Sequence, residues 1–263
     1  MINVAVTGAS GKMGKLIIEN ILRFEGMQLS AGFDLVNIGR DVGEVAQLGT
    51  LNVPISDVND LESVLKSSNT DVLIDFTIAP ATVANAPKIA SSGVSLVIGT
   101  TGLTDEQKAV IENSMIENNV AGIISPNYSV GVNVFFNILK EAAKYLGEMD
   151  IEIIEAHHNQ KKDAPSGTAL GAASVISDAL GGKEYVYGRE GLAPRGKEIG
   201  IHAVRGGDIV GDHTVLFAGD GERIEIKHQA HSRQAFAGGA VKAAAWIAAA
   251  KPGVYTMKDI LGL

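Results

Sequence analysis

Residues 155–169 hold the densest group of side chains in this sequence that could carry out acid–base chemistry. His157, His158, Lys161 and Lys162 lie within six residues of one another. Histidine and lysine can transfer protons near neutral pH when their surroundings adjust their pKa values. An apolar run at residues 151–154 precedes this group and has the character of a β-strand. The pattern predicts a strand that ends in a loop rich in cationic, proton-active groups.

A helix start follows the same loop. Ser166 precedes a helix-like pattern that reaches about residue 180, and serine is a common N-cap. The first N–H groups of a helix have no partners inside the helix, so they form a site for anions. Cations and N–H groups therefore converge on one loop, which suits a small substrate with several carboxylates. A solvated basic loop is the alternative, and this combination of residue types disfavours it.

A glycine-rich turn near the start of the chain predicts a dinucleotide site. Residues 2–6 read as a buried strand, Gly8, Gly11 and Gly14 follow, residues 15–24 have helical periodicity, and residues 28–33 read as a second strand. Asp34 ends that strand, twenty positions after Gly14. Glycines let the backbone approach a pyrophosphate, and the carboxylate accepts ribose hydroxyls. Ser10 occupies the place of the second glycine in the commoner motif, and an ordinary turn is the alternative interpretation.

Strand and helix patterns alternate up to residue 124, which predicts a parallel sheet with right-handed crossovers. Ligands of such sheets bind beyond the carboxyl ends of the strands. Short polar segments follow several of the predicted strands and should meet at that edge. The predicted cofactor contacts are Gly8, Ala9, Ser10, Gly11, Lys12, Met13, Asp34, Thr77, Gly99, Thr100, Thr101, Ser125, Pro126, Asn127 and Tyr128.

The pattern changes after residue 128. A long helix is predicted over 130–146, a strand over 149–156, and strand-like runs over 201–204, 209–218 and 223–230. Residues 181–200 are predicted to form an extended, partly mobile loop. A small-residue helix over 235–249 should return to the first domain. We therefore predict an α/β protein: a Rossmann-like parallel-sheet dinucleotide domain (1–127 and 237–263) and a smaller α+β substrate-binding and oligomerisation domain with a mixed sheet (128–236).

Composition excludes several classes of function. The 263-residue chain has a formal net charge of −8, which argues against binding to nucleic acid or to anionic membranes. Cysteine is absent, so neither disulfides nor thiolate zinc sites are expected. No signal peptide and no membrane span is predicted, and a soluble cytoplasmic protein is the expectation. His228 and His231 lack a third strong ligand, so no metal site is predicted.

Another group of nicotinamide enzymes shares the glycine spacing but not the chemistry. Short-chain dehydrogenases of the extended type donate protons from a Tyr-x-x-x-Lys pair. None of the five tyrosines in this sequence is followed by a lysine four residues later, so that mechanism is not available here.

The assembled motifs resemble the dihydrodipicolinate reductase (4-hydroxy-tetrahydrodipicolinate reductase) family. The resemblance covers nearly the whole chain, through residues 8–14, 75–77, 99–102, 126–133, 155–169, 205–213 and 232–233. The segment His-His-Asn-Gln-Lys followed by Asp-Ala-Pro-Ser-Gly-Thr is its most specific part. Many relatives have Arg-His where this chain has Asn159-Gln160, while the flanking catalytic positions are intact.

The resemblance implies reduction of a cyclic imine dicarboxylate to tetrahydrodipicolinate, on the diaminopimelate route to lysine. It implies that His157 is the proton donor/acceptor, Lys161 the proton donor, and His158, Gly167 and Thr168 the contacts of the substrate carboxylates. It also implies a two-domain fold assembled as a homotetramer.

The cofactor is expected to be NADH and/or NADPH. Asp34 favours NADH, because a carboxylate repels the 2′-phosphate of NADPH. Leu35 stands where relatives that favour NADPH often have arginine, while Lys12 and Arg40 could still supply positive charge. NADH is therefore expected to work well and NADPH to be tolerated.

Two other interpretations stay open from the sequence. One is a nicotinamide-dependent reductase of a different small amino or keto acid. The other is a redox-sensing regulator built on a dinucleotide domain, although a regulator that binds DNA should carry a basic surface.

Overall fold

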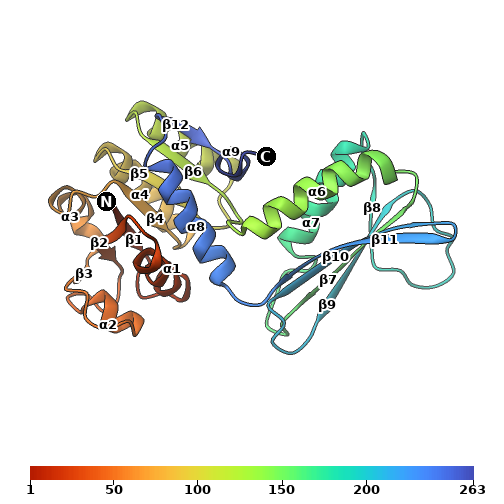
Figure 1. The fold of residues 1–263 in the computed structure, drawn as a ribbon, viewed down its shortest axis with the longest axis horizontal. Helices are drawn as coiled ribbons and strands as arrows, with labels where there is room; N and C mark the ends of the chain where they lie inside the picture. Colours follow the sequence, from red (N-terminus) through yellow and green to blue (C-terminus); the bar gives the residue numbers. More distant parts are fainter. The chain divides into compact units, whose positions relative to one another are not determined.

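The structure, a computed structural model, describes all residues from 1 to 263 and divides them into two compact units (Figure 1). The first unit comprises Met1–Val130 and Gln234–Leu263, and the second comprises Gly131–Arg233. The predicted domain boundaries, at 127/128 and 236/237, lie close to these divisions. The chain thus leaves the first unit once and returns to it once.

The first unit is built on a parallel sheet of seven strands, in the order β12-β6-β5-β4-β1-β2-β3. Both faces of the central strands are buried, as in β4, where all four residues are buried. The strands are β1 (Ile2–Thr7), β2 (Met27–Phe33), β3 (Ile55–Ser56), β4 (Val72–Asp75), β5 (Ser95–Ile98), β6 (Ala121–Ile124) and β12 (Gly253–Tyr255). The helices are α1 (Lys12–Arg23), α2 (Val42–Ala46), α3 (Leu61–Ser67), α4 (Ala79–Ser91), α5 (Asp105–Glu117), α8 (Gln234–Ile247) and α9 (Met257–Leu261), with a 3-10 turn at Val58–Asp60.

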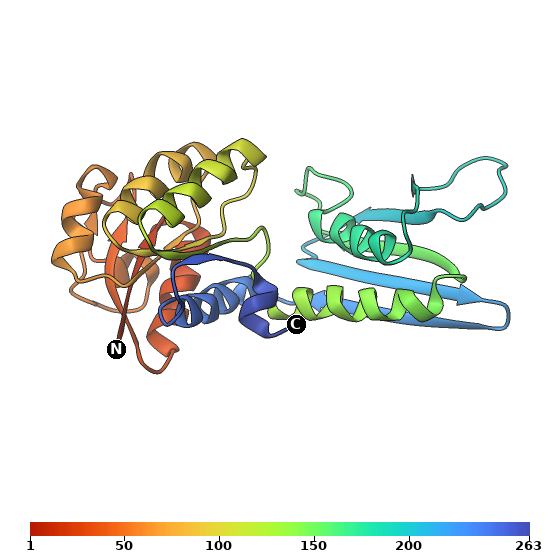
Figure 2. The same ribbon diagram turned by 90° about the horizontal axis from the view of Figure 1, so that it is seen from above.

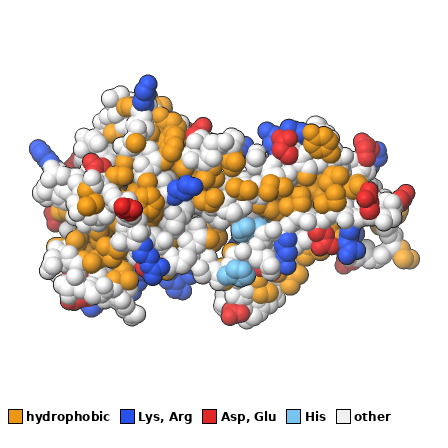
Figure 3. Space-filling view, viewed as in Figure 1, with side chains coloured by type: hydrophobic (Ala, Val, Ile, Leu, Met, Phe, Trp, Pro, Cys, Tyr) orange, Lys and Arg blue, Asp and Glu red, His pale blue; other side chains and the backbone are white.

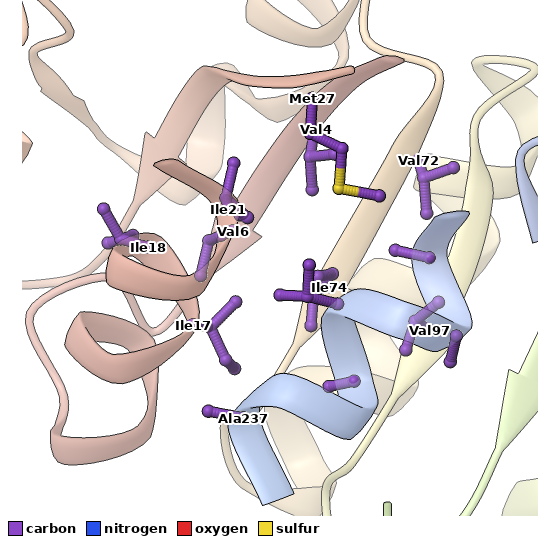
Figure 4. Close-up of a cluster of buried hydrophobic side chains, with 14 of the residues drawn as sticks. Val4, Val6, Ile17, Ile18, Ile21, Met27, Val72, Ile74, Val97 and Ala237 are labelled. Atoms are coloured by element: carbon purple, nitrogen blue, oxygen red, sulfur yellow. The ribbon is translucent and has the colours of Figure 1, made fainter. Parts of the chain in front are cut away.

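Helices cover this sheet on both faces, because side chains alternate along each strand. On one face, Val6 and Ile74 pack with Ile17 of α1 and Ala237 of α8 (Figure 4). On the other face, Leu73 and its neighbours pack with residues of α3, α4 and α5. This confirms the predicted Rossmann-like arrangement.

Small residues let α8 pack closely against the sheet and its loops. A Cβ atom on Gly239 would lie 1.8 Å from the carbonyl oxygen of Tyr128, so only glycine fits there. The helix predicted over 235–249 is therefore present and returns to the first unit, as expected.

The second unit contains a mixed sheet of five strands in the order β11-β10-β7-β9-β8. Its strands are β7 (Asp150–His157), β8 (Tyr185–Tyr187), β9 (Ile199–Arg205), β10 (Gly211–Gly219) and β11 (Glu222–Ala230), and its helices are α6 (Val130–Leu146) and α7 (Gly167–Ala179). Figure 2 shows α6 in green and α7 in teal along these strands. Both helices pack on one face, where Ile151, Ile153 and Phe217 are buried. The opposite face carries no helix of this unit, and Ile154 and Val204 are 41% and 47% exposed there.

The segment 181–200 differs from the prediction of an extended loop. It contains β8, a three-residue strand parallel to β9. Arg189 also pairs with Glu152 and Glu198, with N–O distances of 2.7 Å to each. A strand this short has too few residues for a periodic signal, and Glu152 lies 37 positions from Arg189 in sequence. No helix in the structure combines the length and apolar character that a membrane crossing requires.

Candidate functional site

The turn between β1 and α1 has the geometry of a pyrophosphate cradle. Gly8 has φ +74°, and a Cβ atom there would lie 2.9 Å from the carbonyl oxygen of Phe76. A Cβ on Gly14 would lie 2.1 Å from the carbonyl oxygen of Gly8, so both positions require glycine. No side chain caps the start of α1 at Gly11, and its first turn carries no acidic residue. An anion can therefore approach the N–H groups of this helix.

Asp34 is tied to this turn through the backbone. Its Oδ2 accepts from the N–H of Ser10 at 2.9 Å, and its Oδ1 accepts from the N–H of Leu35 at 2.7 Å. Oδ1 also accepts from the N–H of Val36 at 3.3 Å, whereas Oδ2 has a second lone pair to which a ribose hydroxyl can donate. Asn37 donates to the hydroxyl of Ser10, and Arg40 donates to the side-chain oxygen of Asn37. The sequence-predicted Ser10 and Asp34 are thus brought together, with Arg40 linked to them through Asn37.

A buried carboxylate joins the loops at the carboxyl ends of the central strands. Asp75 is 4% exposed and accepts from the hydroxyls of Thr7 at 2.8 Å, Thr77 at 2.7 Å and Thr82 at 2.6 Å. The hydroxyl of Thr100 lies 2.8 Å from that of Thr82 and accepts from the N–H of Thr77. This network fixes the predicted cofactor residues Thr77 and Thr100 relative to β1 and β4. Asp75 was not among the residues predicted to form the site.

A cavity of about 300 Å³ opens beside this network. Seven of the predicted cofactor contacts line it, together with Phe76 and Phe236. The seven are Met13, Thr77, Gly99, Thr100, Thr101, Pro126 and Tyr128. The other predicted contacts lie at the glycine turn, at the end of β2 and in the loop after β6, outside this lining.

Tyr128 supports the cavity wall and does not serve as an acid. The residue is buried, and its hydroxyl donates to the carbonyl oxygen of Ile98 at 2.8 Å. Burial raises the pKa of this phenol well above its ordinary value, so it stays protonated. Its ring lies 5.7 Å from that of Phe76, measured between centroids. Tyr128 is therefore a fixed part of the wall.

The second unit holds the residues that the sequence predicts to carry out acid–base chemistry. All six histidines lie between 157 and 231, and Figure 3 shows histidine side chains in pale blue at its surface. His157 ends β7, and its Nδ1 lies 2.6 Å from Oε2 of Glu155. Glu155 is fully buried and also meets both terminal nitrogens of Arg205 at 2.8 Å. No group of three or more His, Asp or Glu residues has a geometry that could hold a metal ion.

Two further buried groups complete this network. The N–H of Ser166 donates to Oε1 of Glu155 at 2.9 Å, and its hydroxyl lies 2.9 Å from Nε2 of His213. The rings of His157 and His213 meet edge to face with centroids 5.1 Å apart. Burial, followed by the charge of nearby His157, lowers the pKa of His213 to about 4, so His213 is neutral at pH 7.

The start of α7 has the predicted N-cap. The hydroxyl of Ser166 accepts from the N–H of Ala169, and Gly167 and Thr168 form the first turn. Nothing lies within 4 Å of the position where Gly167 would carry a Cβ atom, so the helix start is uncrowded. The geometry leaves room for a carboxylate at this N-terminus.

Lys161 and His158 lie in the loop between β7 and α7. Nζ of Lys161 pairs with Asp163 at 2.9 Å, and the Lys161 side chain is 21% exposed. The backbone N–H of Lys161 donates to the carbonyl oxygen of His158. The hydrogen bond from Lys161 lowers the pKa of the Asp163 carboxyl, and the positive charges of Lys161 and Arg205 lower it further, against a smaller opposing effect of burial. Lys161 is thus held by a single, half-exposed carboxylate, which a substrate anion could replace.

Sequence reasoning missed Glu155, Arg205 and His213 as parts of the site. One signal was available for Glu155, because residues 151, 153, 155 and 157 share one face of a strand. A carboxylate between Ile153 and His157 on the buried face needs a cationic or donor partner. The identity of that partner, Arg205 on β9, depends on strand pairing that the sequence did not specify.

Comparisons with known proteins cover the whole chain. Residues 2–128 match the family described as "Dihydrodipicolinate reductase, N-terminus", and residues 131–261 match "Dihydrodipicolinate reductase, C-terminus". Proteins named 4-hydroxy-tetrahydrodipicolinate reductase from Methanococcoides burtonii and Methanosarcina mazei are 76% and 70% identical, each over 100% of both chains.

A solved structure agrees with these sequence matches. The structure titled dipicolinate-bound dihydrodipicolinate reductase from Paenisporosarcina sp. TG-14 is 30% identical, has a TM-score of 0.81 and covers 99% of each chain. Sequence, fold and family match coincide over both units, and they confirm the predicted resemblance. The chain belongs to the dihydrodipicolinate reductase family.

Proposed function

We propose that this protein catalyses the NAD(P)H-dependent reduction of 4-hydroxy-tetrahydrodipicolinate to tetrahydrodipicolinate, in lysine and diaminopimelate biosynthesis. The observation that carries the proposal is the 76% identity, over both full chains, to a protein named for this activity. The residues of the β7–α7 loop support it independently, because they offer cations and helix N–H groups to a dicarboxylate.

A nicotinamide cofactor, when bound, supplies the hydride. The cradle at Gly8–Gly14 fits its pyrophosphate, because a Cβ atom at either glycine would clash with backbone. Asp34 would accept ribose hydroxyls. We assign the cavity beside Thr77 and Thr100 to the rest of the cofactor, with the Asp75 network holding its walls.

The substrate loop supplies binding groups and protons. We assign His157 as proton donor/acceptor and Lys161 as proton donor for the reacting imine. His158 and the start of α7 at Gly167 and Thr168 would bind the two carboxylates. Lys161 would leave Asp163 when the substrate arrives, since a carboxylate of the ligand offers an equivalent partner.

For the choice of cofactor, we propose that NADH is used well and that NADPH is tolerated. Asp34 repels a 2′-phosphate, while Arg40 is linked to the same turn through Asn37 and could partly offset that repulsion. Lys12, at the start of α1, is exposed and could contribute as well.

For assembly and location, we propose a homotetramer in the cytoplasm. The sheet face without helices, with Ile154 and Val204 more than 40% exposed, supports contacts between copies of this unit. The cytoplasm follows from the proposed pathway, which draws on the cell's nicotinamide pool. Light scattering coupled to size exclusion would measure the assembly.

The decisive experiment follows nicotinamide absorbance as the purified protein meets enzymatically generated 4-hydroxy-tetrahydrodipicolinate. NADH and NADPH are tested separately, and mass spectrometry identifies the product. Oxidation of either cofactor with formation of tetrahydrodipicolinate supports the proposal. A protein that binds the cofactor but reduces only other imino or keto acids would instead be a different nicotinamide-dependent reductase.

A further inference from the structure

We infer that Glu155 is a positioning residue for His157: it keeps the proton of the neutral ring on Nδ1, so that only Nε2 can exchange a proton with the substrate. This inference rests on the proposed role of His157. It goes further by naming the nitrogen that acts and the buried group that selects it.

Glu155 is ionised, because four donors surround its two oxygens. Its Oε1 accepts from Ser166 N–H and from Nη2 of Arg205, and its Oε2 faces Nη1 of Arg205 and Nδ1 of His157, all at 2.6–2.9 Å. Burial alone would raise the pKa of this carboxyl, but the hydrogen bonds from Arg205, His157 and Ser166 together lower it below its ordinary value. Glu155 is therefore a carboxylate at neutral pH.

The second step concerns the proton on His157. An ionised carboxylate can only accept hydrogen bonds. Nδ1 of His157, at 2.6 Å from Oε2, must therefore donate and carry the proton. In the neutral imidazole the other nitrogen, Nε2, then has a lone pair, and in the imidazolium it has the proton that can leave.

The third step is that the neighbouring groups do not compete for Nδ1. Glu155 on β7, Arg205 on β9 and His213 on β10 are the titratable or charged groups that face this pair. Both terminal nitrogens of Arg205 donate to oxygens, namely those of the Glu155 carboxylate and the backbone carbonyls of Val204 and Asp163. His213 meets the His157 ring edge to face and directs its own Nε2 to Ser166. Glu155 is thus the acceptor that fixes the ring.

The fourth step is that glycine at position 211 leaves room beside Nε2 of His157. A Cβ atom built on Gly211 would sit 3.0 Å from Nε2 of His157, so glycine at this position avoids crowding that ring edge. The His157 side chain is 10% exposed, whereas that of Glu155 is not exposed at all. When Nε2 gives its proton to the substrate it keeps the bonding electrons, and the Nδ1–H bond and the charge on Glu155 stay unchanged.

The experiment uses Glu155→Gln in the full-length protein. The new amide must place either its NH₂ group or its oxygen against His157, and the oxygen is drawn to the two donors, Ser166 N–H and Arg205. The NH₂ group should then donate to Nδ1 and move the ring proton to Nε2. Nitrogen and carbon NMR of labelled histidine should show Nδ1–H for His157 in the parent and Nε2–H in the variant. Turnover should fall by about 10²-fold, with KM for the substrate changed by less than about threefold.

Glu152→Gln is the matched control. Glu152 lies on the same strand and also meets a histidine and two arginines, through His202, Arg189 and Arg195. It faces the other side of the sheet, so its loss should leave the His157 tautomer unchanged and turnover within about twofold. Melting temperature and cofactor binding of all variants show whether each one folds.

Testing Glu155→Gln in a His157→Ala protein shows whether Glu155 positions His157 or has a general structural role. If Glu155 acts through His157, adding Glu155→Gln to His157→Ala should lower turnover by less than about threefold further. An equal 10²-fold loss in both backgrounds, or Nε2–H on His157 in the parent, would overturn the inference. Failure of the proposed function is distinguishable, because a parent that does not reduce 4-hydroxy-tetrahydrodipicolinate would still report its His157 tautomer by NMR.

Discussion

Each unit of this protein buries one carboxylate near the end of a central strand, and the two carboxylates are compensated in different ways. Asp75, at the end of β4, is surrounded by the hydroxyls of Thr7, Thr77 and Thr82. Glu155, near the end of β7, meets a guanidinium, an imidazole and one backbone N–H. Asp75 belongs to none of the ion pairs, whereas Glu155 belongs to two.

The different partners of Asp75 and Glu155 suit the two carboxylates to different tasks, namely ordering a binding site and supporting proton transfer. Hydroxyl donors hold their protons at any physiological pH, so the Asp75 network can order loops without moving a proton. An imidazole beside a carboxylate has a proton that can be exchanged and an orientation that is fixed. The first unit is therefore suited to rigid cofactor binding, and the second to acid–base chemistry.

The largest expected effect tests the chemistry assigned to the second unit. Lys161→Ala should lower turnover by about 10²-fold or more and leave cofactor affinity nearly unchanged, because general acids typically contribute 10²–10⁴. Steady-state kinetics and cofactor titration measure both quantities. Lys162→Ala, at the adjacent exposed position, is the control and should keep full turnover. Normal turnover in Lys161→Ala would remove Lys161 from the mechanism.

The next effect tests the ordering role of the first unit. Asp75→Ala should lower the free energy of unfolding by about 3 kcal/mol, since it leaves the buried hydroxyls of Thr7 and Thr82 and the half-buried hydroxyl of Thr77 without their acceptor. Cofactor affinity should also fall, while the pH dependence of turnover keeps its shape. Chemical denaturation and pH–rate profiles measure these effects. Asp71→Ala, which removes an exposed carboxylate bonded to the N–H of Asn3, should cost less than about 1 kcal/mol. A change in the shape of the pH profile would contradict the division of roles.

A smaller effect concerns stability in mild acid. The pKa of His213 is lowered from 6.5 to about 4, chiefly by burial, so between these pH values the unfolded chain takes up a proton that the native protein does not. The contribution of neutral His213 to the free energy of unfolding is therefore present at pH 7 and is lost as the pH falls from 6.5 towards 4. His213 should contribute a loss of roughly 2 kcal/mol between pH 7 and pH 5. Denaturation curves of the parent and His213→Gln at both pH values measure it; equal pH dependence in the two would show that His213 is not the responsible group.

The smallest effect concerns cofactor choice in the first unit. Asp34→Ala should shift the ratio of kcat/KM for NADPH over NADH upward by about tenfold, because it removes a ribose acceptor and a like charge. Asp34→Asn keeps an acceptor for the N–H of Ser10 and removes only the charge, so it isolates the repulsion. Both ratios are measured at one ionic strength, since salt screens phosphate contacts. A parent that uses only NADPH, with a ratio indifferent to Asp34, would show that Lys12 or Arg40 governs the site.

Local patterns predicted most of the fold. The glycine turn, the helix over 130–146 and the Ser166 N-cap were predicted correctly, because each depends on residues close in sequence. The short elements α2, β3, β12 and α9 were missed, since two to five residues carry no readable period.

In the candidate site, too, residues close in sequence could be predicted and residues brought together by strand pairing could not. The β7–α7 loop could be found from sequence, because its cations are adjacent. The Arg205–Glu155 pair spans 50 positions and the Thr7–Asp75 contact spans 68, so both depend on which strands become neighbours. Cross-strand partners of this kind cannot be predicted from one sequence by local reasoning.

The return of α8 to the first unit has a consequence for how the chain is made. Proteins are synthesised from the N-terminus, and domains generally fold as units during synthesis. When residue 233 leaves the ribosome, the second unit is complete, but Val6, Ile74 and Val97 still lack the α8 side chains that cover them. Strand β6 also waits for β12, its parallel neighbour at Gly253–Tyr255. The protein therefore begins its first unit first and finishes it last, and its nascent chain carries an open apolar surface throughout synthesis of the second unit.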